Sequence, residues 1–384
     1  MKLDKTYTYG KQNISWKDIW EVVKVLRSPF LTQGPKIFEF EKVICDCTGA
    51  KYSVVVSNAT AALHIAMKAL GISEGDEVIT SPNTFLASAN AVIYVGGAVK
   101  FADIDSRTAC IDTAEIKKHI TKQTKVIIPV HYAGQSCDME KIQKIAKEHN
   151  LFIVEDAAHA IGSEYKNNKV GCCQFSDMTV FSFHPVKNLT TGEGGVITTN
   201  NKDLYEKLLK LRSHGIVRDK NSLINNDGSW YYEMPEPGFN YRMTDIQAAL
   251  GISQFKRLDK FVNRRREIVN FYKDAFDNDE RFSFLQEMDD SKAAFHLFPL
   301  LIDFSKVKII KKELFEKLKE SGLNLQVHYI PVHLQPFYSN FGFKKGDFPK
   351  AEKFYQNEVS LPLYYGLNQK DLNYIVDVIK KVVK

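Results

Sequence analysis

The segment Met178-Thr-Val-Phe-Ser182-Phe-His184-Pro185-Val186-Lys187-Asn-Leu-Thr-Thr-Gly192-Glu193-Gly194-Gly195-Val196 joins two apolar runs through a glycine-rich turn. This pattern predicts a buried strand, a loop that carries Ser182 and Lys187, and the start of a second strand. A lysine among apolar and small residues loses its proton readily when water is excluded, as a Schiff-base amine must. Structural lysines more often lie in polar, solvent-facing helices, so Lys187 is a candidate catalytic amine.

Short β-branched and apolar runs alternate with segments of helical period on both sides of this stretch. The predicted strands cover residues 54–56, 77–80, 126–130, 152–155, 178–182 and 196–199. Such alternation is typical of an α/β fold, with a mostly parallel sheet and helices on both of its faces.

The C-terminal third has a different pattern. One long helix is predicted from Thr244 to about Phe276, and Thr244 and Gln247 form a capping box at its start. Lys-rich helices and short strands follow at 295–302, 313–321, 323–328 and 372–383, which indicates a smaller α+β domain. We therefore expect a large domain over residues 1–255 and a small domain over residues 256–384. The charged run 264–266 is interpreted as the solvent-exposed face of the long helix.

Composition excludes several classes of protein. The chain has 384 residues, of which 44% are apolar and 26% charged, as in ordinary globular proteins and unlike disordered or fibrous ones. The net charge of +6 is small for this length and does not suggest a nucleic-acid partner. The six cysteines lack the spacing of a metal site or disulfide scaffold, and no apolar run is long enough for a membrane span. A cytoplasmic protein with reduced thiols, no bound metal and no membrane partner is expected.

A second informative segment runs from Val54 through Ser57, Asn58, Ala59 and Thr60 into an alanine-rich stretch. It predicts a strand that turns through small polar residues directly into a helix. The free backbone N–H groups of Ala59 and Thr60 at that helix start, and the threonine hydroxyl, would suit a phosphate. On this segment alone, an ordinary helix N-cap without a ligand is the more frequent explanation of the same residues.

A third segment, 152–160, is an apolar strand that ends in Glu155-Asp156-Ala-Ala-His159. Ligand sites in open α/β sheets gather at the carboxyl ends of strands, so Asp156 is placed to meet a bound group. A lone carboxylate at a strand end is more often a helix cap or an ion-pair partner, and His159 could equally be a packed core histidine.

Together the three segments supply what pyridoxal 5′-phosphate requires: an amine for its aldehyde, a carboxylate for its pyridine nitrogen and a cup for its phosphate. Phe85 follows another predicted strand end and could stack on the cofactor ring, although a core phenylalanine fits the same pattern.

The chain resembles the fold-type-I, pyridoxal-phosphate-dependent nucleotide-sugar aminotransferases over nearly its whole length. The matching motifs are Leu31-Thr-Gln-Gly34-Pro35, Ser57-Asn-Ala-Thr60, Glu155-Asp-Ala-Ala-His159, Phe181-Ser-Phe-His-Pro-Val-Lys187, Gly192-Glu-Gly-Gly195, Arg212-Ser-His-Gly215, Phe239-Asn-Tyr-Arg-Met-Thr-Asp245 and His328-Tyr-Ile-Pro331. Within that family, FSFHPVK, RSHGI and HYIPVHLQPFY are most similar to aminotransferases of the pseudaminic acid pathway.

The resemblance implies a role for each matching residue. Lys187 would bind the cofactor covalently, Asp156 would pair with the pyridine nitrogen, and Ala59, Thr60 and Ser182 would bind the phosphate. Asn240 would reach the phosphate of a neighbouring subunit in a homodimer with shared active sites. The remaining matches are Phe85 and His159 beside the cofactor ring, and the residues that line the nucleotide-sugar site: Tyr9, Pro29, Phe30, Leu31, Thr32, Ala59, His328, Tyr329, Ile330 and Pro331.

The implied reaction moves an amino group from L-glutamate to C4 of UDP-2-acetamido-2,6-dideoxy-β-L-arabino-hex-4-ulose. Its product is UDP-4-amino-4,6-dideoxy-N-acetyl-β-L-altrosamine. Aminotransferases of other nucleotide 4-keto sugars, of the bacillosamine or perosamine type, remain alternatives, because Pro237 and the Asn- and Tyr-rich insert 221–236 depart from many relatives. A sugar dehydratase is less favoured because known examples have a histidine in place of the lysine. A non-catalytic binding protein is disfavoured by the joint presence of Asp156, Ser182 and Lys187.

Overall fold

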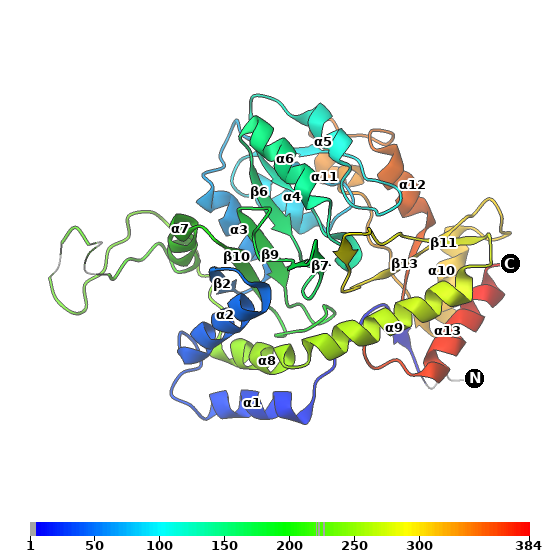
Figure 1. Ribbon diagram of the computed structural model, residues 1–384, viewed down its shortest axis with the longest axis horizontal. Helices are drawn as coiled ribbons and strands as arrows, with labels where there is room; N and C mark the ends of the chain where they lie inside the picture. The colour runs from blue at the N-terminus through cyan, green and yellow to red at the C-terminus, as the bar shows by residue number, and fades with distance from the viewer. Residues whose placement is uncertain (1–4, 220, 222, 226) are drawn as a thin grey trace.

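The central sheet dominates the computed structural model, which describes residues 5–219, 221, 223–225 and 227–384 (Figure 1). Within these residues the sheet has seven strands in the order β2-β10-β9-β6-β5-β3-β4. Their bounds are β2 Tyr52–Val56, β10 Gly195–Thr199, β9 Met178–Ser182, β6 Phe152–Asp156, β5 Thr124–Ile128, β3 Glu77–Thr80 and β4 Ala98–Phe101. All neighbours pair in parallel except β10, which is antiparallel to both β2 and β9. The prediction of a mostly parallel α/β sheet is confirmed.

Helices cover both faces of this sheet, as alternate residues of β2 show. Val54 and Val56 pack in the apolar cluster that contains α3, whereas Val55 packs with Phe40 of α2 on the opposite face. The helices that surround the sheet are α2 Pro35–Thr48, α3 Ala59–Ala69, α4 Leu86–Ile93, α5 Thr113–His119, α6 Met139–His149 and α7 Lys202–Arg212. Helix α1 (Trp16–Leu26) lies farther out and packs on α8 (Asp245–Phe255). Strand β2 is therefore fixed between two apolar layers.

The predicted long helix is two helices, α8 Asp245–Phe255 and α9 Leu258–Phe276, so the prediction of one continuous helix is wrong. At the break, Arg257 donates a hydrogen bond of 2.6 Å to the buried Asp18 of α1 and another of 2.8 Å to the carbonyl oxygen of Asn13. This tertiary ion pair lies at the turn that redirects the chain. As a result α8 packs on α1 and α2, while α9 runs toward the C-terminal sheet (Figure 1).

Arg265 corrects a second prediction, that the run 264–266 is a solvated helix face. Its side chain is buried, with 2% of the residue exposed. The guanidinium donates to the carbonyl oxygens of Leu363 (2.7 Å), His296 (3.1 Å) and Phe295 (3.3 Å). A buried guanidinium needs such acceptors, so Arg265 ties α9 to two loops next to the site.

A second apolar cluster joins α9 to a three-stranded antiparallel sheet in the order β11-β13-β15. Its elements are β11 Phe282–Phe284, β13 Phe298–Ile302, α10 Lys311–Glu320, β15 Glu358–Leu361 and α13 Gln369–Val382. The short β1 (Tyr7–Thr8) pairs in parallel with β14 (Leu323–Asn324), so Tyr7 belongs to this cluster although it is near the N-terminus. The domain division at residue 255 stays a prediction.

Several C-terminal residues pack with the large sheet instead. Val332, Tyr338 and Phe354 belong to the first apolar cluster. They lie in or near η2 (Val332–Leu334), α11 (Pro336–Ser339) and α12 (Pro349–Asn357). The remaining small elements are β7 Glu164–Tyr165, β8 Asn168–Lys169, β12 Ser291–Lys292 and η1 Tyr132–Gly134. Part of the C-terminal third thus packs against the large sheet.

The described residues between α7 and α8 project away from the body of the molecule as an arm (Figure 1). Among its described residues, Ile224, Trp230, Tyr232 and Met234 are exposed. No helix within the described ranges is both long and apolar enough to cross a membrane.

Candidate active site

A cleft of about 990 Å³ opens at the carboxyl ends of β2, β6 and β9, where open α/β sheets place their ligands. The loop 326–329 and Tyr9, which follows β1, close it from the side of the smaller sheet. Ten of the residues proposed from the sequence line this one cavity: Tyr9, Ala59, Thr60, Phe85, Asp156, His159, Ser182, Lys187, His328 and Tyr329.

The start of α3 forms the first wall of the cleft. Asn58 is the N-cap, and its side-chain oxygen accepts from the backbone N–H of Ala61 at 2.8 Å. The N–H groups of Ala59 and Thr60 have no intrahelical acceptor at these first positions, so they remain available to an anion. Gly195 lies against them: a Cβ there would come within 2.6 Å of the Ala59 nitrogen. Glycine is therefore required for β10 to approach this turn.

Lys187 lies in the loop between β9 and β10, as the sequence predicts. Burial lowers the pKa of its amine to about 8, although the charge of Asp156 acts in the opposite direction. Among the described residues the amine forms no ion pair within 4 Å. A substantial part of it is therefore neutral, and nucleophilic, near pH 8.

Asp156 ends β6 and faces Lys187 in the cleft. Its Oδ2 accepts from the Ser88 hydroxyl at 2.5 Å, and its Oδ1 accepts from the Ala158 N–H at 3.1 Å. Ser88 is itself held by the hydroxyl of Thr84 at 2.7 Å. Sequence reasoning did not identify Ser88, because nothing local shows that α4 reaches the end of β6.

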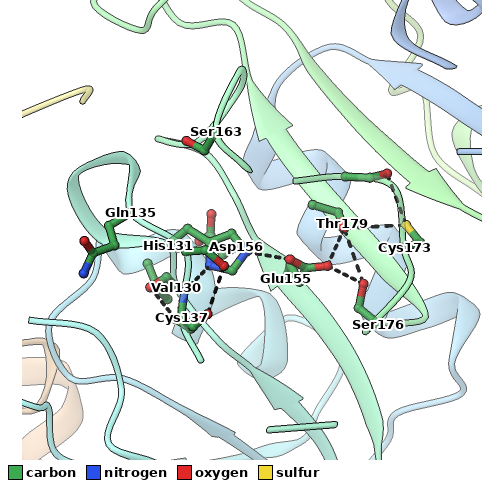
Figure 2. Close-up of polar contacts among 12 residues, drawn as sticks. Val130, His131, Gln135, Cys137, Glu155, Asp156, Ser163, Cys173, Ser176 and Thr179 are labelled. Atoms are coloured by element: carbon green, nitrogen blue, oxygen red, sulfur yellow. Dashed lines mark hydrogen bonds and ion pairs between the residues drawn. The ribbon is translucent and has the colours of Figure 1, made fainter. Parts of the chain in front are cut away.

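The side chain of Glu155 points away from Asp156 into a closed polar cluster (Figure 2). His131 Nε2 lies 2.6 Å from one carboxylate oxygen, and the hydroxyls of Ser176 and Thr179 donate to the other. The Cys137 N–H donates to His131 Nδ1 at 3.1 Å, so the ring proton is on Nε2 and the contact to Glu155 is a hydrogen bond of a neutral imidazole. Burial would raise the pKa of Glu155, but these hydrogen bonds outweigh it and the pKa is lowered.

Three buried histidines line the cleft near Lys187: His159, His296 and His328. Burial lowers the pKa of each, and the Lys187 charge lowers it further, to about 3 for His328. All three are therefore neutral at ordinary pH. His159 Nε2 lies 2.9 Å from the Tyr329 hydroxyl, whereas the Nδ1 atoms of His159 and His296 have no partner among the described residues.

A family model described as the DegT/DnrJ/EryC1/StrS aminotransferase family matches residues 12–380. The chain belongs to this aminotransferase family. It is 42% identical over 378 residues to the spore coat polysaccharide biosynthesis protein SpsC of Bacillus subtilis, covering 98% of this chain and 97% of that protein. It is 39% identical over 380 residues to the UDP-4-amino-4,6-dideoxy-N-acetyl-β-L-altrosamine transaminase of Campylobacter jejuni, with the same coverage.

Two solved structures have the same fold as this aminotransferase. Helicobacter pylori PseC, an aminotransferase involved in the biosynthesis of pseudoaminic acid, superposes with a TM-score of 0.91 at 34% identity and covers 99% of each chain. Spr1654 of Streptococcus pneumoniae, described as a sugar aminotransferase, superposes with a TM-score of 0.90 in its PLP form at 32% identity. That alignment covers 99% of this chain and 100% of Spr1654.

The cleft of the aminotransferase fits pyridoxal phosphate. It contains free N–H groups at a helix start for the phosphate, a carboxylate for the ring nitrogen and an amine for the aldehyde. The unpartnered Nδ1 of His159 is a buried polar atom in need of a ligand group. The donor set, the available space and the charges are therefore consistent with this cofactor.

The other predicted residues lie outside the cleft of their own chain. Asn240 is exposed, at the base of the arm, and forms an isolated bridge with Ser213. Pro29, Phe30, Leu31 and Thr32 are exposed beside the start of α8, where the Leu31 carbonyl accepts from the Asp245 N–H. Ile330 is exposed and Pro331 is buried, and neither lines the cleft. Their proposed roles stay predictions.

Proposed function

We propose that this aminotransferase uses pyridoxal phosphate to move an amino group from L-glutamate to C4 of a UDP-linked 4-keto-6-deoxy-N-acetylhexosamine. The observation that carries the proposal is the single cleft in which Lys187, with a pKa of about 8, faces Asp156 beside the free start of α3. Bound there, the cofactor supplies an electron sink and a temporary carrier for the amino group.

Each wall of the cleft has a task in this proposal. The N–H groups of Ala59 and Thr60 and the hydroxyls of Thr60 and Ser182 bind the cofactor phosphate. Asp156, oriented by Ser88, accepts the N–H of the pyridinium ring and keeps that ring nitrogen protonated. Phe85 and His159, which line the same cleft, would lie beside the cofactor ring, Phe85 as a stacking aromatic.

Lys187 moves the protons. Its neutral amine takes the proton from Cα of glutamate in the first half of the reaction, and its ammonium delivers a proton to sugar C4 in the second. The lysine reaches C4 from one face only, so its position decides the configuration of the new amine. A pKa of about 8 suits both tasks, since each protonation state is populated near neutral pH.

The sugar nucleotide is proposed to enter over Tyr9, His328 and Tyr329, with Ile330 and Pro331 at the rim. Rings of Tyr9 and His328 pack with centroids 4.5 Å apart, and those of His328 and Tyr329 pack at 4.9 Å. This aromatic wall offers apolar faces to the sugar and polar edges to its hydroxyl groups.

We also propose a cytoplasmic homodimer with shared active sites. Asn240 and residues 29–32 lie outside the cleft of their own chain, which agrees with contributions to a neighbour's site. The arm exposes Trp230, and exposed apolar side chains also cluster around α1 and α2, among them Trp16, Trp20 and Phe38. Apolar groups of this size favour burial against a second protein surface.

The sugar specificity is tested by proton NMR of the products formed from a pair of UDP-4-keto-6-deoxy-N-acetylhexosamines, β-L-arabino and D-xylo, with glutamate as the amino donor. Turnover of the β-L-arabino ketone to the β-L-altrosamine product supports the proposal. Exclusive use of the D-xylo ketone would move the enzyme to the bacillosamine type. If neither ketone is converted but the enzyme still releases 2-oxoglutarate from glutamate, this sugar class is rejected and transamination is not.

A further inference from the structure

Three buried polar residues connect the small sheet to the cleft: Glu358 and Ser360 of β15, and His328. The Ser360 Oγ lies 2.5 Å from Glu358 Oε1 and 2.8 Å from His328 Nδ1. The backbone N–H of His328 donates to the second carboxylate oxygen, Glu358 Oε2, at 2.9 Å. The three residues thus form a closed ring of hydrogen bonds.

The His328 ring cannot easily turn. The backbone carbonyl oxygen of His328 accepts from the Tyr132 hydroxyl, which holds the main chain. The imidazole ring packs against the rings of Tyr9 and Tyr329 in edge contacts. The N–H of Ser360 also donates to the Gln326 carbonyl oxygen at 3.0 Å, which fixes β15 beside the loop. With Nδ1 turned toward Ser360, Nε2 is the ring nitrogen left for a ligand in the cleft.

The direction of the hydrogen bonds follows from the charge on Glu358. This carboxyl group is fully buried, and burial raises its pKa to about 7 although the Ser360 hydroxyl, the His328 N–H and the nearby charge of Lys311 favour the anion, so the carboxylate predominates above pH 7. Above that pH Glu358 is a carboxylate, which only accepts, so the Ser360 hydroxyl donates to it. The remaining lone pairs of Ser360 Oγ then accept a proton from His328 Nδ1.

We propose that Glu358, acting through Ser360, is a positioning residue that keeps the proton of neutral His328 on Nδ1 and presents Nε2 to the substrate as an acceptor. This inference rests on the proposed function, since it assigns His328 to the substrate side of the cleft. The groups that Nε2 would accept from are the hydroxyl or amide N–H groups of the sugar.

The variant Glu358→Gln gives a sharp test because the ring of hydrogen bonds fixes the orientation of the new amide. Its carbonyl oxygen must accept from the His328 N–H, so its NH₂ group points at Ser360 Oγ and donates to it. The Ser360 hydroxyl must then donate to His328 Nδ1, and the imidazole proton moves to Nε2. The acceptor offered to the substrate becomes a donor.

Two measurements on the holoenzyme test this proposal: the tautomer of His328 and the KM for the keto sugar. The ¹⁵N NMR spectra of histidine-labelled protein are recorded at about pH 8.5, where Glu358 is ionised, and the His328 signals are assigned by their absence in His328→Gln. The wild type should then have a protonated Nδ1 and Glu358→Gln a protonated Nε2. The KM for the keto sugar should rise about tenfold or more, because a buried donor then faces substrate donors. The glutamate half-reaction and the cofactor absorbance should stay near wild type.

Ser360→Ala and Ser360→Thr complete the test. Removal of the hydroxyl should leave His328 with a mixture of both tautomers and a raised KM, whereas threonine retains the hydroxyl and should restore the wild-type tautomer. Ser360→Ala decides the question if Glu358→Gln does not fold. A wild-type His328 protonated on Nε2, or variants with an unchanged tautomer and KM, would overturn the inference. The NMR result needs no substrate, so it stands apart from any failure of the proposed sugar reaction.

Discussion

Glu155 and Asp156 are adjacent carboxylates at the end of β6, yet their surroundings differ. Both oxygens of Glu155 are hydrogen-bonded within a closed cluster of side chains that includes His131, Ser176 and Thr179 (Figure 2). Asp156 accepts from Ser88 and faces a cleft in which the Lys187 amine has no ion-pair partner among the described residues.

The contrast shows that burial of polar groups does not by itself mark a functional site. On the Glu155 side the donors and acceptors match, as a stable core requires. On the Asp156 side, buried atoms such as His159 Nδ1 are without partners in the described part of the chain, and the Lys187 amine has a shifted pKa. An unpartnered amine with a shifted pKa, at the carboxyl ends of the strands, therefore marks the face that awaits a ligand.

The largest effect is expected on the cleft side, from Lys187→Ala. Loss of the amine should reduce turnover by a factor on the order of 10³ or more, because it removes both the nucleophile for the cofactor and the group proposed to move the protons. The phosphate cup should still hold pyridoxal phosphate non-covalently. Initial rates with glutamate and keto sugar, and absorbance after gel filtration, measure both effects.

Lys202, on the exposed face of α7, provides the matched control for that substitution. Lys202→Ala should keep wild-type turnover. Normal turnover by Lys187→Ala would contradict the assignment of the catalytic amine.

On the other side of β6, Glu155→Gln should affect stability. Replacement of the carboxylate weakens hydrogen bonds to a charged group and should cost about 2 kcal/mol of unfolding free energy. Because folding lowers the pKa of Glu155, its stabilisation is complete above the unfolded-state pKa and is lost as pH falls through the folded-state pKa. Urea unfolding measures this effect. The unfolding free energies of variant and wild type should differ strongly at pH 7 and become similar at acid pH.

Glu140 forms an exposed ion pair with Lys166, so Glu140→Gln should change stability by less than about 0.5 kcal/mol. If Glu155→Gln were equally mild at pH 7, the cluster would not stabilise the fold, and the comparison of the two sides would fail.

The lowered pKa of Lys187 should also be visible in reconstitution of the apoprotein. The rate of covalent attachment of pyridoxal phosphate, followed by absorbance, should rise roughly tenfold per pH unit well below pH 8 and level off above it. Asp156→Asn removes a negative charge that favours the ammonium form, so it should move the midpoint to lower pH. The rate at which pyridoxal phosphate reacts with Nα-acetyl-lysine amide, measured over the same pH range, corrects for titration of the cofactor. If the midpoint for the protein were near that of this free amine, the pKa of Lys187 would not be lowered.

The smallest effect is expected from Ser88→Ala, which removes one hydrogen bond to Asp156 and leaves the charge in place. We expect a loss of roughly fivefold in kcat/KM, equal to about 1 kcal/mol. Ser305 donates a similar bond of 2.6 Å to Asp303 on an exposed turn, so Ser305→Ala is the control and should have no kinetic effect. Equal kinetics for both variants would show that Ser88 does not position Asp156.

The parts of the site that were predicted from the sequence are local patterns. A strand that runs directly into a small-residue helix start or a glycine-rich loop specifies Thr60, Asp156 and Lys187 without any knowledge of distant contacts. The structure gathers these residues in one cleft, as expected from strands whose carboxyl ends share one edge.

The parts that were missed depend on long-range contacts. The edge strand β4 and the buried strand β15 were not predicted, because Lys100 interrupts the apolar run of β4, and Glu358 and Ser360 give β15 a polar pattern. The break between α8 and α9 coincides with the ion pair of Arg257 with Asp18, a residue 239 positions away. Such partners leave no periodic signal in the chain.

The pairing of β1 with β14 has a consequence for biosynthesis on the ribosome. Tyr7 pairs with Leu323, so Tyr9 cannot take its place in the cleft until nearly the whole chain has been translated. At about 5–20 residues per second this takes roughly 15 to 60 s, during which the N-terminal segment waits without its partner strand. The strands of the large sheet all precede residue 200, so this sheet can form before the substrate wall assembles in the cell.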